Sequence, residues 1–128
     1  MSLSKPQYSI TYHGLEKLVE LTWLRETQSM TDQDFKDGIF VFAECALQLS
    51  ARHLIIDMRE FRYRPSPEAQ VIRDEVVVPK YIKAGVKKIA WIWPGESGDR
   101  LTETADGNFE NHYVDTVADA FAWLTAKA

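Results

Sequence analysis

Hydrophobic and polar residues alternate along the first part of the chain in the way that is typical of a β-hairpin. Tyr8, Ile10 and Tyr12 alternate with polar residues, which is the period of a strand with one solvent-facing side. A second alternating run covers residues 17–23, and Gly14 lies between the two runs. Two such runs joined by a short connection containing glycine predict an antiparallel hairpin.

A long amphipathic helix is predicted next, from Thr31 to about Ser50. Thr31 suits the N-cap, and Asp34 stands where a capping box places its acidic residue. Met30 and Phe35 have the spacing of a hydrophobic staple. Apolar residues then recur at intervals of four and three and form one buried stripe: Phe35, Ile39, Phe42, Ala46 and Leu49.

Two later runs, residues 53–58 and 87–93, are short and apolar almost throughout, as is typical of strands covered on both faces. A second helical region is predicted between them. It begins at Ser66, an N-cap residue followed by proline. We expect a kink or restart at Pro79, which lacks a donor and follows a β-branched run, and an end at Gly85.

The last part of the chain predicts a polar connection over residues 94–108, a short strand over 109–114 and a final helix capped by Asp115. The inner side of that helix is predicted to carry Val117, Phe121 and Leu124. The element order β-β-α-β-α-β-β-α indicates one α/β domain over residues 1–128. Its sheet is expected to be mixed, mostly parallel and about five strands wide, with helices packed on it.

Helices between buried strands imply right-handed crossovers and parallel neighbours. The carboxyl ends of parallel strands meet at one edge, where ligand sites in open α/β sheets gather. Residues 24–30, 59–66 and 94–108 are therefore predicted to share this edge, which locates a working surface without naming its chemistry.

Composition narrows the class of protein. The chain has 128 residues, a net charge of −4 and one cysteine. A chain of this length fits a single domain, and the negative charge argues against nucleic-acid binding. No apolar run approaches a membrane span, no signal peptide is visible, and one cysteine allows no internal disulfide. We therefore expect a cytoplasmic protein.

Four segments resemble a known family: residues 56–61 (IDMREF), 66–70 (SPEAQ), 84–90 (AGVKKIA) and 118–124 (ADAFAWL). Together they are similar to the SpoIIAA-like group of the STAS superfamily, relatives of the anti-sigma-factor antagonists. The resemblance implies a SpoIIAA/STAS-like fold and a regulatory or binding role. Ser66 matches best the serine that is phosphorylated in the antagonists, so it is a possible phospho-acceptor. An ordinary N-cap is the alternative interpretation of Ser66.

An arginine cluster precedes this serine. Arg59, Arg62 and Arg64 lead into the helix start at Ser66, where unpaired N–H groups and guanidinium donors suit a phosphate, a carboxylate or an acidic partner. The alternative is a solvated loop in which the arginines pair with acidic neighbours, Glu60 and Glu68.

Other residues carry weaker signals. Asp57 ends a buried strand, and pairing with Arg59 or with backbone donors is the favoured interpretation. Trp91 and Trp93 share one face of their strand. They either pack beneath a helix or line an apolar pocket for a lipid-like ligand, and the lipid-binding SEC14-like relatives of the resembled group support the second reading.

The remaining candidates for chemistry are few. Cys45 has no basic neighbour, which favours a packing role for its thiol. The three histidines are too far apart in sequence to suggest a metal site. No catalytic motif or cofactor motif is present. Apolar residues outside the main stripe of the long helix (Phe40, Val41 and Leu47) suggest a possible homodimer.

The sequence thus predicts a non-enzymatic regulatory or protein-interaction domain without a cofactor. Its partner is an unknown protein. The alternative is a domain that binds or carries a small anionic or lipid-like molecule in a cleft at the carboxyl edge of the sheet.

Overall fold

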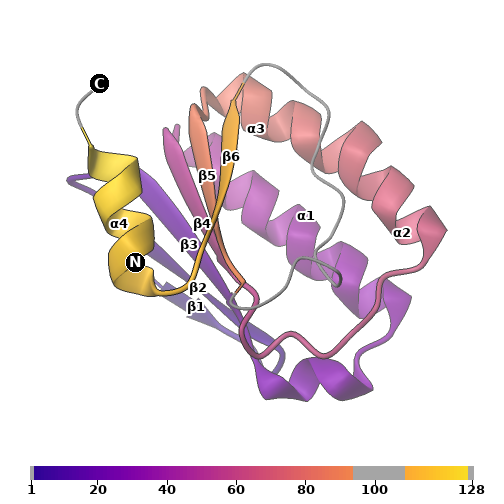
Figure 1. Cartoon of the computed structure of the whole chain (residues 1–128). Helices are drawn as coiled ribbons and strands as arrows, with labels where there is room; N and C mark the ends of the chain where they lie inside the picture. Colours follow the sequence, from indigo (N-terminus) through magenta and orange to yellow (C-terminus); the bar gives the residue numbers. More distant parts are fainter. Residues whose placement is uncertain (1, 94–108, 127–128) are drawn as a thin grey trace.

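The computed structural model describes residues 2–93 and 109–126 and shows an α/β fold built on one six-stranded sheet (Figure 1). The strands lie side by side in chain order: β1 (Ser2–Ser4), β2 (Tyr8–His13), β3 (Leu18–Trp23), β4 (His53–Asp57), β5 (Lys88–Ile92) and β6 (Glu110–Val114). Strands β1 to β3 pair antiparallel, and β3 to β6 are parallel. The mixed, mostly parallel sheet is therefore confirmed.

The sheet is one strand wider than expected. Residues Ser2–Ser4 form β1 at its edge, with Leu3 opposite Ile10. Three residues are too few to show a period of two, and the strand depends on pairing with β2 rather than on a pattern of its own.

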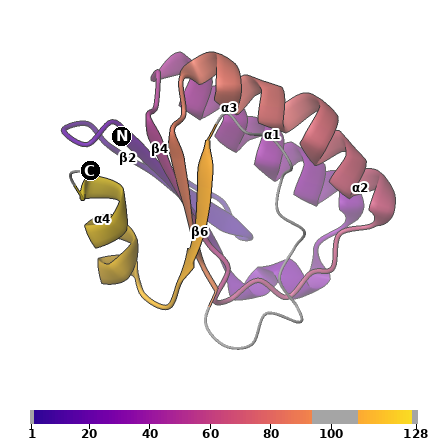
Figure 2. The same cartoon turned by 45° about the horizontal axis from the view of Figure 1, so that its top comes forward.

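Helices cover both faces of the sheet. One face carries α1 (Asp32–Gln48) and the second crossover, which consists of α2 (Pro67–Ile72), the π-helical turn η2 (Arg73–Val77) and α3 (Val78–Ala84); the other carries α4 (Val117–Thr125) (Figures 1 and 2). A 3₁₀ turn, η1 (Arg25–Ser29), leads into α1. Coverage on both sides explains why β4 and β5 are apolar almost throughout.

The predicted helix starts and stops are largely present. Thr31 Oγ1 accepts from Asp34 N and Asp34 Oδ2 accepts from Thr31 N, both at 3.1 Å, which completes the capping box. Gly85 ends α3 with a φ of 98°. One cap differs: Thr116, not Asp115, begins α4, because the Thr116 hydroxyl accepts from Asp119 N at 3.0 Å.

A hydrophobic core lies on each face of the sheet, between the sheet and the helices that cover it. The larger one lies between the sheet and the helices α1 and α3 and contains most of the buried aromatic residues. The smaller one lies under α4 and consists of Leu18, Ile55, Ala90, Ile92, Ala120 and Leu124. None of the described helices is long and apolar enough to cross a membrane.

Candidate functional site

The carboxyl ends of the parallel strands meet at one edge, as predicted. Asp57, the last residue of β4, lies opposite Thr22 of β3 and Ile92 of β5. Beyond the strand, Met58 N still donates to Ile92 O at 2.9 Å. The segments 24–30 and 59–66 therefore leave the sheet from the same edge. The third predicted segment, 94–108, lies outside the described residues.

The segment 59–66, which we call the arginine loop, is anchored through a buried threonine. Thr27 is fully buried, and its hydroxyl accepts from Arg62 N at 2.8 Å and donates to Glu60 O at 3.4 Å. Nothing in the sequence singles out Thr27, because its role appears only when η1 and the loop are brought together. These bonds satisfy backbone groups of the loop and fix its path.

Aromatic packing holds the loop from beneath. Phe61 and Tyr63 pack against the core residues Trp23 and Phe35, with ring centroids 5.2 Å apart for Phe61–Trp23 and 5.7 Å for Tyr63–Phe35. The intervening Arg62 is exposed, as is the next residue after Tyr63, Arg64. The loop thus alternates aromatic side chains facing inward with arginines facing outward.

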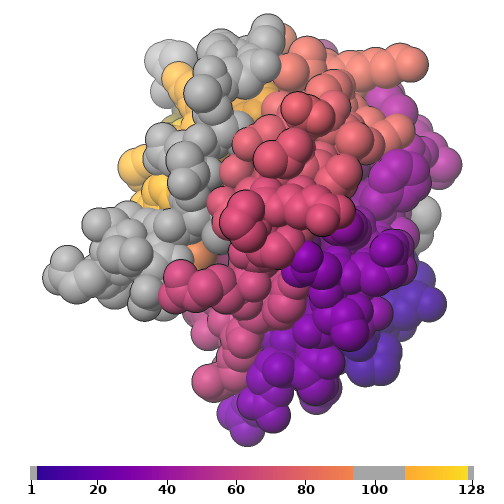
Figure 3. Space-filling model, turned by 90° about the vertical axis from the view of Figure 1, so that its right-hand side faces the viewer, coloured from indigo at the N-terminus to yellow at the C-terminus, as the bar shows by residue number. Residues whose placement is uncertain are grey.

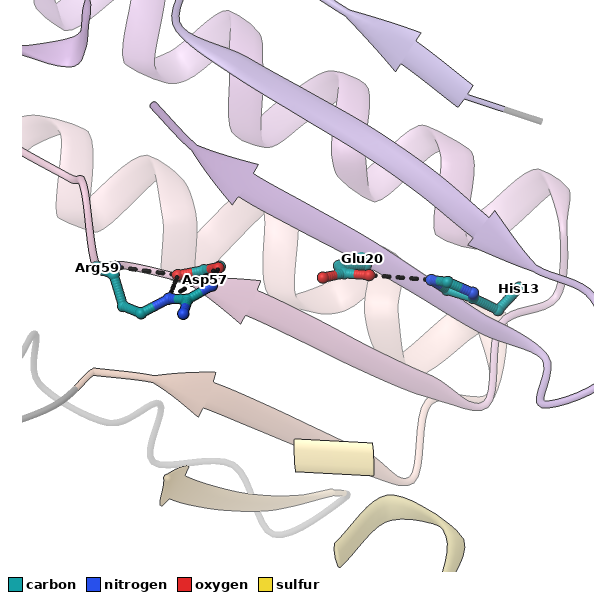
Figure 4. Close-up of polar contacts among 4 residues, drawn as sticks. All are labelled: His13, Glu20, Asp57 and Arg59. Atoms are coloured by element: carbon teal, nitrogen blue, oxygen red, sulfur yellow. Dashed lines mark hydrogen bonds and ion pairs between the residues drawn. The ribbon is translucent and has the colours of Figure 1, made fainter. Parts of the chain in front are cut away.

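Arg59 forms a close pair with the buried Asp57 (Figure 4). Its Nη2 lies 2.7 Å from Asp57 Oδ2 and its Nε lies 3.0 Å from Oδ1, while its backbone N–H also donates to Oδ1 at 3.1 Å. The predicted pairing of Asp57 is confirmed. Hydrogen bonding to Asp57 raises the pKa of Arg59, so the charge of Arg59 is permanent but largely neutralised by its partner.

The other arginine contacts are looser. Arg62 lies 3.5 Å from Glu60, and both side chains are about half exposed, which makes the pair weak. Glu68 bonds Lys36 at 3.1 Å, so the alternative pairing is present for Glu60 and is wrong for Glu68. Arg62 can exchange its present partner for another carboxylate at little cost.

Ser66 is the N-cap of α2, as predicted. Its hydroxyl accepts from Ala69 N at 3.1 Å and donates to Asp32 Oδ2. Asp32 is the first residue of α1, so this bond joins the starts of the two crossovers. From the sequence alone, Asp32 is only an acidic residue in the first turn of the long helix. Its contact with Ser66 is not visible there, because it depends on how the starts of α1 and α2 come together in the fold.

A cavity of about 30 Å³ lies between the sheet and the helices α1 and α3, towards the carboxyl half of the strands. Its walls are almost wholly apolar: Leu21, Trp23, Phe35, Ile39, Ile56, Met58, Arg73, Val78, Tyr81, Ile89 and Trp91. Trp91 is buried in this wall, with its Nε1 donating to Asn111 Oδ1 at 2.9 Å. Trp93 lies further along, with its ring centroid 6.5 Å from that of Tyr113, and does not line the cavity.

Among the residues that the structure describes, Arg73 is the one charged residue in the cavity wall. It is 7% exposed, begins the π-helical turn η2 and donates from Nε to Asp74 Oδ1 at 3.0 Å. Sequence reasoning missed it, although a signal exists: Arg73 stands midway between Ala69 and Val77, four residues from each, and all three are buried. An arginine inside an apolar stripe points into the protein.

A second polar pair lies on the same face of the sheet as Asp57, the face opposite the cavity. The Nε2 atom of His13 lies 2.9 Å from Glu20 Oε1 (Figure 4). The ring of Phe121 in α4 meets the His13 ring edge-on, with ring centroids 5.3 Å apart. His53, at the start of β4, has a buried Nδ1 that bonds no described group. Burial lowers the pKa of His53, and Lys88 and Arg52 add to this effect. Within residues 2–93 and 109–126 no three metal-binding side chains form a group.

Two further residues singled out in the sequence lie on α1. Burial raises the pKa of the Cys45 thiol, which agrees with a packing role. Phe40 is 43% exposed, with the ammonium of Lys80 5.0 Å from its ring centroid.

Comparison with protein-family models, with curated proteins and with solved structures found no match.

Proposed function

We propose that this chain is a non-enzymatic regulatory or protein-interaction domain of the SpoIIAA/STAS-like type, acting in the cytoplasm, and that the arginine loop docks an acidic segment of a protein partner. The observation that carries the proposal is the rigid mounting of the loop. Thr27 holds its backbone and Phe61 and Tyr63 hold it to the core, so little freedom is lost when its arginines bind.

The charge distribution supports an acidic partner. The chain as a whole carries a net charge of −4, whereas this loop has two exposed arginines, Arg62 and Arg64, one on each side of Tyr63. Guanidinium groups bind carboxylates through paired hydrogen bonds and favour the right partner over others. A small basic patch on an acidic protein gives selectivity without general attraction to polyanions.

Fluorescence anisotropy with a labelled decapeptide of aspartate and glutamate tests the proposal. We expect the double variant Arg62→Ala/Arg64→Ala to bind about tenfold more weakly, a loss of about 1.4 kcal/mol, and binding by the wild type to weaken with salt. Lys83→Ala/Lys87→Ala is the matched control, because it removes two exposed cations at the opposite edge of the sheet. Equal losses in the two variants, or no binding by the wild type, would count against the loop.

Ser66 is the proposed switch of this surface. Its hydroxyl donates to Asp32, and a phosphate there replaces that bond by repulsion between two anions while also disturbing the cap of α2. Phosphorylation would therefore loosen the junction between α1 and α2 beside the arginine loop. In the anisotropy assay, we expect Ser66→Asp to reduce peptide binding more than Ser66→Ala does.

The alternative function, binding of a small molecule, is favoured by the apolar cavity beneath Trp91. Pockets for drug-sized ligands have volumes of roughly 300–1,000 Å³, so a cavity of about 30 Å³ suits a small ligand better than a lipid-like one. Native mass spectrometry of freshly purified protein tests for such a ligand. A retained small mass supports the alternative, and bare protein at all collision energies opposes it.

The exposed part of α1 supports one further proposal, a homodimer. Phe40 is 43% exposed and Val76 of the neighbouring η2 is 39% exposed, which gives the helical layer apolar side chains that a second copy could cover. Sedimentation at micromolar concentration, compared between wild type and Phe40→Ser, separates a dimer held by this surface from a monomer.

A further inference from the structure

The amino ends of the parallel strands meet at the edge of the sheet opposite the arginine loop (Figure 1). This edge, which we call the basic edge, carries four exposed cations: Lys17, Arg52, Lys83 and Lys87. Among the described residues, none of the four forms an ion pair. Two carboxylates lie at the same edge, those of Glu16 and Glu110. The edge is thus locally basic on a chain whose net charge is −4.

The main chain holds three of these cations in a row. Lys17 O accepts from Arg52 N at 2.8 Å, and Arg52 O accepts from Lys87 N at 2.7 Å. The three residues therefore lie side by side at the starts of β3, β4 and β5, about 4.8 Å apart from strand to strand. Like charges on neighbouring strands repel, so an anionic surface placed against the row relieves that repulsion.

Lys17 occupies its place at a conformational cost. Its φ is 49°, in the left-handed region where glycine and asparagine are less strained than lysine. Strain of this kind collects where a residue serves a function. A lysine at this turn position adds a charge to the basic edge that the less strained residues would not supply.

The turn between β2 and β3 also carries an apolar side chain into solvent. Leu15 is 99% exposed, and the turn projects from the sheet beside the basic edge (Figure 2). A single exposed leucine is ordinary on a protein surface, but this one stands two residues from Lys17 at the tip of a hairpin. Proteins that lie on a bilayer combine these two features: an apolar group enters the headgroup boundary while cations meet anionic lipids.

We propose that Leu15 and the basic edge dock on the surface of an anionic phospholipid bilayer without crossing it. An acidic protein or a nucleic acid also attracts cations, but neither accounts for the fully exposed leucine at the tip. The arginine loop lies at the other end of the strands, so in this orientation it faces away from the bilayer. The inference goes beyond the function proposed above and does not depend on it.

The test is flotation of the full chain with vesicles, either of phosphatidylcholine alone or of phosphatidylcholine and phosphatidylserine in equal parts. We expect binding only to vesicles with phosphatidylserine, weakening as salt screens the charges. Lys83→Ala/Lys87→Ala should bind at least tenfold more weakly, because each cation near an anionic surface contributes about fivefold. Arg62→Ala/Arg64→Ala is the matched control, since it changes the net charge equally at the opposite edge and should leave vesicle binding unchanged.

Variants of the turn test the leucine and the strained lysine. Leu15→Ser should weaken vesicle binding about fivefold without changing the temperature of unfolding, because the side chain is fully exposed. Val71→Ser is its matched control, since Val71 is 49% exposed on α2, away from the basic edge, and should bind as the wild type does. Lys17→Asn removes a charge and relieves strain, so we expect weaker binding at an equal or higher unfolding temperature.

The outcomes separate a lipid surface from other anions. Wild type that floats equally with both kinds of vesicle, or equal losses in the lysine and arginine double variants, would overturn the proposal. A single-stranded oligonucleotide that binds more tightly than the vesicles, with no effect of Leu15→Ser, would assign the edge to nucleic acid instead. The acidic decapeptide should bind Leu15→Ser and Lys17→Asn as it binds the wild type, so failure at one edge leaves the other untouched.

Discussion

The two crossovers of this fold lie side by side on the same face of the sheet, yet they are built differently. In Figure 3 the second crossover (pink to salmon) packs directly against α1 (purple). The first is one regular helix of 17 residues with a complete capping box. The second is divided into α2, a π-helical turn and α3. The regular crossover supports the sheet, whereas the irregular one carries the candidate chemistry.

The sequence explains the difference. In α1 the apolar residues follow helical spacing without interruption, and its Gly38 lets the helix approach the sheet closely, because a Cβ there would come 3.0 Å from the Trp23 ring. In the second crossover the β-branched run 76–78 is followed by Pro79, which has no backbone N–H to donate to the helical hydrogen-bond pattern. The π-helical turn takes up this break and begins at Arg73.

The largest expected effect separates scaffold from surface within α1. Phe42 is fully buried, and Phe42→Ala should lower the free energy of unfolding by about 3–5 kcal/mol through lost burial and a new cavity. Phe40→Ala, on the exposed side, should cost less than about 1 kcal/mol. Chemical denaturation of both variants measures the contrast, and similar losses would mean that α1 is not packed as described.

The next prediction concerns the buried charge of the second crossover. Arg73→Met replaces a guanidinium in an apolar wall by a side chain of similar length. Since apolar replacement of a buried ionic group is often neutral or stabilising, we expect the free energy of unfolding to stay within about 1 kcal/mol of the wild type or to rise. A fall of about 3 kcal/mol would show instead that Arg73 is a structural anchor.

A smaller effect tests the bond between the two crossovers. Ser66→Ala removes both the cap of α2 and the bond to Asp32, and should cost about 1 kcal/mol. Ser66→Asp restores a capping oxygen but sets it against Asp32. We expect Asp32→Asn to rescue Ser66→Asp and not Ser66→Ala in a double-mutant cycle of thermal unfolding. No coupling between positions 32 and 66 would contradict the described contact.

The smallest predicted effect lies in β4, the strand between the crossovers. Burial lowers the pKa of His53, so the unfolded chain takes up a proton at a higher pH than the folded chain. Stability from this residue is therefore complete above the ordinary pKa of about 6.5 and falls below it, by no more than about 1.4 kcal/mol per pH unit. Unfolding measured at pH 7.5 and 5.5 should show this loss in the wild type and less of it in His53→Gln.

Sequence reasoning predicted the local features of the fold well. The hairpin, the capping box at Thr31, the break before Pro79 and the left-handed Gly85 each depend on residues close together in the chain. The three-residue strand β1 was missed, because it is defined by its pairing with β2. The cap of α4 was placed one residue too early, because the hydrogen bond from Asp119 N to the Thr116 hydroxyl decides its position.

The candidate site was harder to predict, for the same reason. The pairing of Asp57 with Arg59 is local and was found. Thr27 and Asp32 act through contacts with distant segments, which a helical period of 3.6 does not show. Arg73 did carry a signal, its place four residues from the buried Ala69 and Val77, but that signal was missed.

The most direct test of the proposed division of labour is an amide chemical-shift map recorded while the acidic decapeptide is added. We expect the shifted signals to gather in residues 59–66 and at the start of α2, with the exposed side of α1 around Phe40 unchanged. Shifts concentrated around Phe40, with the arginine loop unmoved, would contradict the assignment of binding to the second crossover.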